Sequence, residues 1–202
     1  MEKKYKLTEE TFAVDGHVLH RIKALRDFGN VKKGDIGGWI EGQENLSHDD
    51  DCWVYGYAEV YGEAKVYGYA EVCGEAKVYG YAEVCGEAKV YGEAKVYGYA
   101  EVYGKAKVYG YAEVCGEAKV YGEAEVHGNA EVEKKSDYIV FKNWWSSGRY
   151  FTWTRSNDMW TVGCFYGTGE ELIKKAYADN EEKGREYERV VKYVESIKSE
   201  IK

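Results

Sequence analysis

Residues 54–72 read VYGYAEVYGEAKVYGYAEV, and this six-residue pattern continues without an insertion to Val132. Valine returns at every sixth position, glycine follows it two positions later, and alanine follows that glycine by two. Self-similarity at a short fixed period is typical of solenoid proteins, in which each repeat packs mainly on its neighbours. The repeat therefore decides the fold class.

Within each repeat, alanine and valine alternate with larger polar or aromatic residues. This period of two indicates a short strand whose alanine and valine face the core. Glycine lacks a Cβ atom, so the chain can bend at the corner that follows. Three repeats then make one triangular coil, and coils stack about 4.8 Å apart, as neighbouring strands do. The repeat segment predicts between four and five coils, roughly 20 Å of solenoid.

Charged residues that lie one coil apart support this arrangement. Opposite signs meet in six pairs: Glu59 and Lys77, Lys65 and Glu83, Glu71 and Lys89, Lys95 and Glu113, Glu101 and Lys119, and Lys107 and Glu125. Opposite charges on adjacent strands stabilise the register by a few tenths to about 1 kcal/mol per pair. Tyrosines form further columns on all three faces, so we interpret them as a coat over the strands rather than a binding surface.

The composition limits the classes of partner. Residues 54–133 hold 14 glutamates and 7 lysines, and the whole chain has a net charge of −8. Double-stranded DNA is disfavoured, because its binders cluster lysine and arginine. No apolar run reaches the ~18 residues of a membrane span, and the N-terminus lacks the apolar core of a signal peptide. The five cysteines have no paired spacing, so we expect free thiols and a cytoplasmic location.

Residues 1–53 are expected to form a β-rich cap, in which Asp15-Gly16 predicts a hairpin. The acidic run Asp49-Asp50-Asp51 cannot turn three side chains toward one ion, so we interpret it as a solvated turn rather than a metal site. The runs RIKALRDFGNV (21–31), GDIGGWI (34–40) and CWVY (52–55) resemble the opening of the YdcK-like family of bacterial and phage proteins. The resemblance covers roughly residues 4–133 and implies a left-handed β-helix of hexapeptide repeats.

The resemblance also implies what an enzyme of this type would need. Many hexapeptide-repeat proteins are trimeric acyltransferases with a histidine near a subunit interface, often beside a loop extruded from the coil. This repeat extrudes no loop, and His127 occupies a tyrosine position within it. His17, His20 and His48 lie in the N-terminal segment, and none has a partner spacing that suggests an activated base.

Residues 134–202 carry more basic than acidic side chains. Strands are predicted over 138–144, 149–155 and 159–165, with a two-residue turn that sets Arg155 opposite Trp160. A capping box at Thr168-Gly-Glu-Glu opens a first helix, and a second follows Asn180. The prediction is a small α+β domain of three strands and two helices, which resembles tail modules of uncharacterised phage and prophage proteins.

The candidate binding residues combine aromatic rings with guanidinium groups in this basic segment. They are Trp144, Trp145, Arg149, Tyr150, Arg155 and Trp160. Such sets are typical of protein interfaces and of sites that stack single-stranded bases. Phe151 and Trp153 are instead interpreted as core residues of the small domain.

The sequence thus predicts a mainly β chain: an N-terminal hairpin cap (1–53), a single-stranded left-handed parallel β-helix (54–133) and a C-terminal α+β domain (134–202). The favoured function is a non-enzymatic scaffold that presents the C-terminal module to a protein partner. The phage and prophage resemblance implies a host protein, including a defence component. The alternatives are an acyl-CoA-dependent acyltransferase and a binder of nucleic acid or carbohydrate through aromatic surface. No cofactor, metal or membrane is expected, and homo-oligomerisation is left open.

Overall fold

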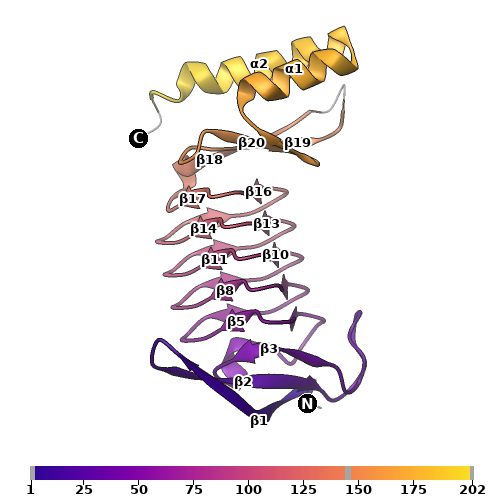
Figure 1. Ribbon diagram of the computed structural model, residues 1–202, viewed down its shortest axis with the longest axis vertical. Helices are drawn as coiled ribbons and strands as arrows, with labels where there is room; N and C mark the ends of the chain where they lie inside the picture. Colours follow the sequence, from indigo (N-terminus) through magenta and orange to yellow (C-terminus); the bar gives the residue numbers. More distant parts are fainter. Residues whose placement is uncertain (1–2, 144–146, 201–202) are drawn as a thin grey trace.

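The computed structural model describes residues 3–143 and 147–200. Figure 1 shows a column of stacked coils with a hairpin at one end and a small sheet with two helices at the other. The column is a parallel solenoid of about five coils, so the mainly β fold is confirmed. The left-handed sense of the coil stays a prediction.

Each hexapeptide contributes one two-residue strand to the solenoid. In chain order the strands are β4 (Trp53–Val54), β5 (Glu59–Val60), β6 (Lys65–Val66), β7 (Glu71–Val72), β8 (Lys77–Val78), β9 (Glu83–Val84), β10 (Lys89–Val90), β11 (Lys95–Val96), β12 (Glu101–Val102), β13 (Lys107–Val108), β14 (Glu113–Val114), β15 (Lys119–Val120), β16 (Glu125–Val126) and β17 (Glu131–Val132). Every third strand pairs in parallel, as Val60 does with Val78, which confirms three repeats per coil.

The core and the corners follow from the repeat. The repeat valines and alanines are at most 1% exposed. The corner glycines from Gly56 to Gly128 have φ angles between +62° and +73°, a region that residues with a Cβ rarely adopt. A Cβ on Gly92 would also lie 3.1 Å from the backbone of Gly110 in the next coil. Glycine is therefore needed for both the turn and the stacking.

Five of the six predicted charge pairs are ion pairs among the described residues, with N–O distances from 2.6 to 2.9 Å. At the sixth position Lys65 lies in register with Glu83, whose carboxylate accepts a hydrogen bond from Tyr67 at 2.8 Å. Like charges also meet, because Lys77 lies in register with Lys95. The columns therefore run in pairs of equal sign rather than alternating at every coil.

The N-terminal segment extends one face of the solenoid. β1 (Tyr5–Val14) and β2 (His17–Ala24) form the predicted hairpin around Asp15-Gly16, both of which have positive φ. β3 (Ile36–Ile40) pairs antiparallel with β2 and parallel with β5. The short 3-10 helix η1 (Gln43–Asn45) follows. β3 thereby covers the edge that β5 would otherwise expose, and the hairpin continues the same sheet.

The C-terminal segment contains a four-stranded antiparallel sheet and two helices. Its elements are η2 (Lys135–Asp137), β18 (Tyr138–Lys142), β19 (Tyr150–Thr154), β20 (Met159–Val162), β21 (Phe165–Gly167), α1 (Gly169–Asp179) and α2 (Glu181–Ile197). Thr168 forms the predicted capping box with Glu171. The three-stranded prediction was wrong, because the chain turns at Gly163 (φ +60°) and forms β21.

The predicted register of the β19–β20 hairpin was also wrong. Trp153 pairs with Trp160 and Thr154 with Met159, so the loop has four residues, not two. Asn157 stabilises this loop, since its Oδ1 accepts hydrogen bonds from the Thr154 hydroxyl and the Met159 amide. The loop brings Trp153 Nε1 within 2.8 Å of Asp158 Oδ1.

One face of this sheet closes the solenoid and the other carries the helices. The Thr152 hydroxyl accepts the Glu125 amide N–H at 3.0 Å, and Ser156 accepts that of Glu131 at 2.7 Å. The Tyr138 hydroxyl donates to the Lys119 carbonyl at 2.9 Å. These hydroxyl groups thus form hydrogen bonds that the backbone of a following coil would otherwise form.

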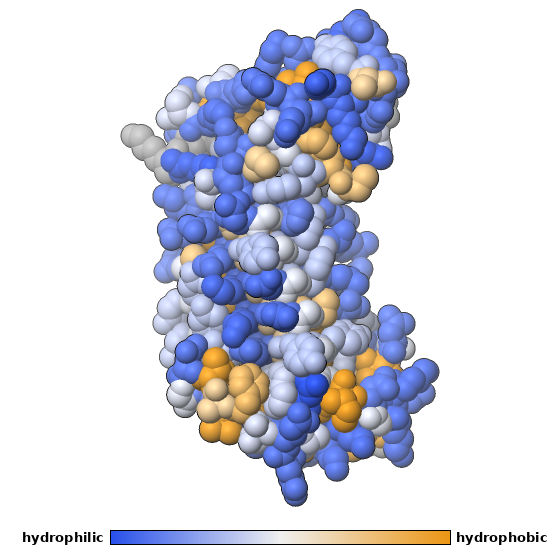
Figure 2. All heavy atoms as spheres, viewed as in Figure 1, coloured by the Kyte–Doolittle hydropathy of each residue, from blue (hydrophilic) through white to orange (hydrophobic). Residues whose placement is uncertain are grey.

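Hydrophobic and hydrophilic residues are distributed unevenly along the column. Figure 2 shows hydrophobic residues gathered mainly near the two ends of this face, with mostly hydrophilic side chains over the coils between them. No helix within the described residues is long and apolar enough to cross a membrane.

Candidate functional site

The predicted C-terminal binding residues that the structure describes do not form one surface. Trp144 and Trp145 lie outside the described residues. Trp160 is 2% exposed and packs in the core between the sheet and the helices, so its place in the predicted surface was wrong. Its position in β20 faces the helices, where a large apolar ring is needed.

The remaining three residues lie in different surroundings. Arg149 precedes β19 and borders a small cavity between the sheet and the helices, which Lys175 and Lys183 also line. Tyr150 accepts a hydrogen bond from Lys142 at 3.2 Å. Arg155, at the other end of β19, lies 3.9 Å from Asp137. The structure therefore separates a charged cluster around Arg149, in which Asp179 pairs with Lys183, from the other two side chains.

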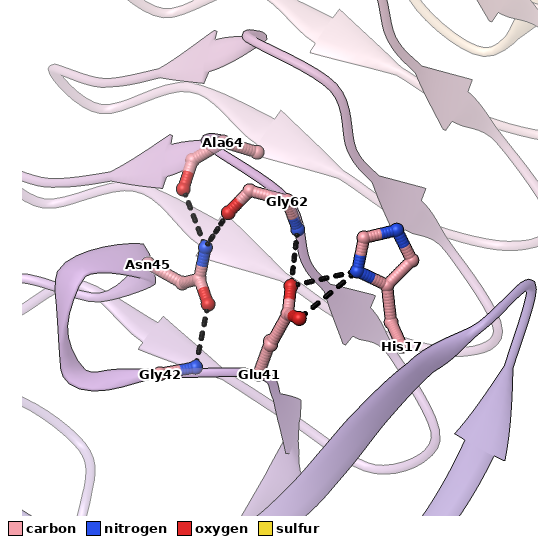
Figure 3. A network of polar contacts seen from close by, with 6 residues as sticks. All are labelled: His17, Glu41, Gly42, Asn45, Gly62 and Ala64. Atoms are coloured by element: carbon pink, nitrogen blue, oxygen red, sulfur yellow. Dashed lines mark hydrogen bonds and ion pairs between the residues drawn. The ribbon is translucent and has the colours of Figure 1, made fainter.

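A histidine–carboxylate pair lies at the other end of the molecule, at a histidine for which the sequence shows no partner spacing that suggests activation. Figure 3 shows His17, from the start of β2, turned toward Glu41, which directly follows β3. Its Nδ1 atom lies 2.9 Å from both carboxylate oxygens. No local spacing predicts this contact, because antiparallel strands bring together residues that are far apart in the sequence.

The Glu41 carboxylate is held by more than the histidine. It accepts the Gly62 backbone N–H at 2.8 Å. Burial raises the pKa of Glu41, but hydrogen bonds from His17 and Gly62 outweigh it and bring this pKa below its ordinary value. An ionised carboxylate fixes the tautomer and orientation of its imidazole, as in acid–base catalytic pairs. The His17 side chain is 37% exposed, so the imidazole is open to solvent.

Asn45 anchors the same network to the first coil (Figure 3). Its amide donates to the carbonyls of Gly62 and Ala64, both at 2.9 Å. Its side-chain oxygen accepts the Gly42 N–H at 2.8 Å. These bonds satisfy first-coil carbonyls and hold the chain that follows Glu41, so the network also has a structural role.

The backbone of the acidic turn at 49–51 binds the ammonium group of Lys4. The buried Lys4 ammonium donates to the backbone carbonyls of Cys52 at 2.9 Å, Asp49 at 3.3 Å and Asp50 at 3.4 Å. Burial lowers the pKa of Lys4 below its ordinary value. Within the described residues, no group of three His, Cys, Asp or Glu side chains is placed to hold a metal ion.

Comparison with known proteins finds a similarity over a limited length of the chain. A stretch of 61 residues is 36% identical to the Escherichia coli (strain K12) protein named "Uncharacterized acetyltransferase YdcK". The alignment covers 26% of this chain and 19% of that protein, so the chain spans about a fifth of the relative's length. No family model matches the chain. The similarity and the solenoid together fit a hexapeptide-repeat family.

Proposed function

We propose that the protein is a non-enzymatic scaffold, a rigid solenoid that presents its C-terminal module to a protein partner. A cytoplasmic location belongs to this proposal. So does a host protein as the partner, which rests only on the resemblance of the C-terminal module to phage and prophage proteins.

The observation that supports the proposal best is the way the module is attached. Hydroxyl groups of Thr152, Ser156 and Tyr138 bond directly to the backbone of the last coils. Several short contacts in different directions hold two bodies in one orientation, whereas a flexible linker would not. The ion-pair columns and the close-packed valine core make the solenoid a stiff spacer.

The charged cluster around Arg149, with Lys175, Lys183 and Asp179, is the part of the module that we assign to the partner. Arg149 and Lys175 are both exposed and border the same cavity, and Lys175 also lies over the Phe165 ring at 5.5 Å. Arginine is enriched among the residues that dominate the binding energy of interfaces, and a lysine over an aromatic ring adds a further attraction.

The test is affinity capture from a cell lysate, with partners identified by mass spectrometry and confirmed with purified components. Arg149→Glu with Lys175→Glu is expected to abolish capture of the partner while the thermal unfolding midpoint stays unchanged. The matched control reverses two exposed solenoid charges, Lys65→Glu with Lys105→Glu, and is expected to retain capture. Retention of capture by the first variant would contradict the assignment of this surface, as would loss of capture by the control.

A second candidate function is acyl transfer from a CoA thioester, favoured by the contact between His17 and Glu41 and by the YdcK similarity. In this function the imidazole takes a proton from an acceptor hydroxyl or amine, which then attacks the thioester carbonyl. The CoA thiolate leaves and takes up a proton. Glu41 stabilises the imidazolium that forms.

Release of free thiol from acetyl-CoA, measured with hydroxyl and amine acceptors, tests this second function. His17→Ala is expected to lower the rate on the order of a hundredfold or more, and Glu41→Gln to lower it less. His20→Ala is the control, because His20 lies on the same strand and contacts the Thr8 carbonyl instead. Absence of turnover and of CoA binding would contradict acyl transfer and leave the scaffold proposal standing.

A further inference from the structure

All three solenoid sheets end against the C-terminal sheet, and the third, whose Lys119 contacts Tyr138, also borders an open groove. The third sheet contains β6, β9, β12 and β15, with β15 as its last strand. Two adjoining hollows of about 700 Å³ and about 440 Å³ lie next to this end and share Lys135 as a lining residue. Volumes of this size accommodate small ligands or parts of a longer one.

Two tyrosine stacks terminate in this groove. Tyr81 and Tyr99 are stacked with centroids 5.0 Å apart, and Tyr103 and Tyr121 with centroids 5.2 Å apart. Tyr99 is 63% exposed and Tyr121 is 46% exposed. One coil beyond Tyr99 the same position holds Glu117, and one coil beyond Tyr121 the solenoid has ended. Among the described residues, each stack therefore ends in a ring with no further ring of its column above it.

The polar side chains of the groove carry both signs. The hollow beside Tyr99 is lined by Glu101, Glu117, Lys119 and Lys134. Lys119 and Glu101 form an ion pair at 2.6 Å, with side chains 39% and 38% exposed. Since carboxylates accept and ammonium groups donate hydrogen bonds, the lining offers both kinds of partner at near-zero net charge.

The balance of positive and negative side chains in the groove disfavours a polyanion as its ligand. Nucleic acid depends on uncompensated lysine and arginine, and here glutamates accompany the lysines in each hollow. A ligand that has hydroxyl groups on its rim and flat C–H surfaces on its faces matches the lining better. Hydroxyl groups need donors and acceptors together, and C–H surfaces pack on the faces of aromatic rings.

We propose that this groove binds an uncharged oligosaccharide, with one sugar ring against Tyr99 and another against Tyr121. Lys135 lies between the two positions, because it lines both hollows. Tyr138 and Tyr150 close the groove on the side of the C-terminal sheet. The proposal is independent of the scaffold function and of acyl transfer.

The test is isothermal titration of the full-length protein with three neutral hexasaccharides: β-1,4-linked glucose, β-1,4-linked N-acetylglucosamine and α-1,4-linked glucose. Binding of at least one of them is expected at millimolar concentration or below. Tyr99→Ala and Tyr121→Ala are each expected to weaken it about tenfold. Thermal unfolding of each variant shows that the fold is retained.

Tyr111→Ala is the matched control, because Tyr111 is 65% exposed but does not line either hollow. It is expected to leave the affinity unchanged. Failure of all three sugars to bind would overturn the proposal, as would equal weakening by the control. Tighter binding of a single-stranded oligonucleotide at the same groove would also overturn it, since the ligand would then be a polyanion.

Discussion

At the scale of single residues, the corner glycines answer two separate demands. One is the positive φ angle, and the other is the close approach of the next coil. Gly92 and Gly122 allow the two demands to be distinguished, because their φ angles are nearly equal, at +73° and +70°, and only the approach of the next coil differs. A Cβ on Gly92 meets the backbone of Gly110 at 3.1 Å, whereas one on Gly122 meets nothing within 4 Å.

We therefore expect Gly92→Ala to destabilise the protein more than Gly122→Ala. The left-handed conformation alone costs roughly 1–2 kcal/mol for a residue with a Cβ, and that is the full effect expected at Gly122. At Gly92 the contact between coils adds to it. Urea denaturation of both variants measures the difference, and equal losses would show that stacking tolerates a methyl group at the corner.

Lys4 is the second residue whose loss should be severe. Lys4→Met removes the donor to three buried or partly buried carbonyls and is expected to cost about 2–3 kcal/mol. Lys6→Met changes an exposed lysine two residues further on, in β1, and should be nearly neutral. A comparable free energy of unfolding for the two variants would contradict the role of the Lys4 ammonium.

His127 predicts a pH dependence. Its ring stacks on Tyr109 at 4.0 Å, and burial lowers the pKa of His127 below the ordinary value of 6.5. As the pH falls through this value, the unfolded chain binds a proton before the folded protein does, so stability decreases. We expect His127→Tyr, which restores the repeat residue, to reduce the loss of stability between pH 7 and pH 5. Chemical denaturation at both pH values measures this difference. An identical loss of stability in the wild type and the variant would rule out a contribution from His127.

At the scale of elements, the charge columns stabilise the register by pairs of neighbouring coils. Glu113→Lys places a third lysine beside Lys95 and Lys77, which already lie in register. This change is expected to cost about 1 kcal/mol.

Lys95→Glu combined with Glu113→Lys should recover that loss. The column then alternates in sign from Glu59 to Glu131, so every coil meets an opposite charge. A double variant as unstable as the single one would show that the columns do not set the register. Thermal unfolding at low and high salt tests this, because the effect should shrink as salt screens the charges.

The elements also show what the sequence predicts and what it leaves open. A strict period determined the solenoid, because the buried positions of every coil depend on nearest neighbours. The register of β19 against β20 was mispredicted for a physical reason. Slipping the pair by two residues keeps Trp153, Trp160 and Val162 on the same face, so the hydrophobic pattern cannot choose between the registers. The hydrogen bonds of Asn157 in the loop select the observed register.

The candidate sites were harder to predict than the elements. The contact between His17 and Glu41 joins two residues that are 24 positions apart in the sequence, and no periodicity predicts it. The composition of the C-terminal segment indicated a binding surface but could not separate Trp160, which is buried, from Arg149, which is exposed. Core and interface use the same aromatic residues, so only the register distinguishes them.

At the scale of the whole molecule, we expect that removal of one complete coil preserves the stacking of the remaining coils. Deletion of residues 78–95 brings Lys77 beside Glu113, Glu71 beside Lys107, and Lys65 beside Glu101. Each new contact joins opposite charges, so we expect the shortened protein to fold, with its two ends about 4.8 Å closer.

Deletion of a single hexapeptide, residues 78–83, is the control. It leaves the solenoid nearly as long but should turn the C-terminal sheet by about a third of a turn relative to the hairpin. Spin labels at the exposed positions Val18 and Tyr193 distinguish the two deletions by distance. Identical label distances would show that the coils do not stack as a triangular column.

The uniformity of the coils also has a consequence for how the chain folds. Since successive coils present nearly the same valine, alanine and glycine positions, a nascent coil matches a segment shifted by one whole repeat unit almost as well as its native neighbour. Contacts made once in the chain, such as Asn45 to Gly62 and Thr152 to Glu125, remove this degeneracy. The two terminal segments therefore fix the register of the first and last coils. A chain that lacks either segment should populate misaligned, kinetically trapped species.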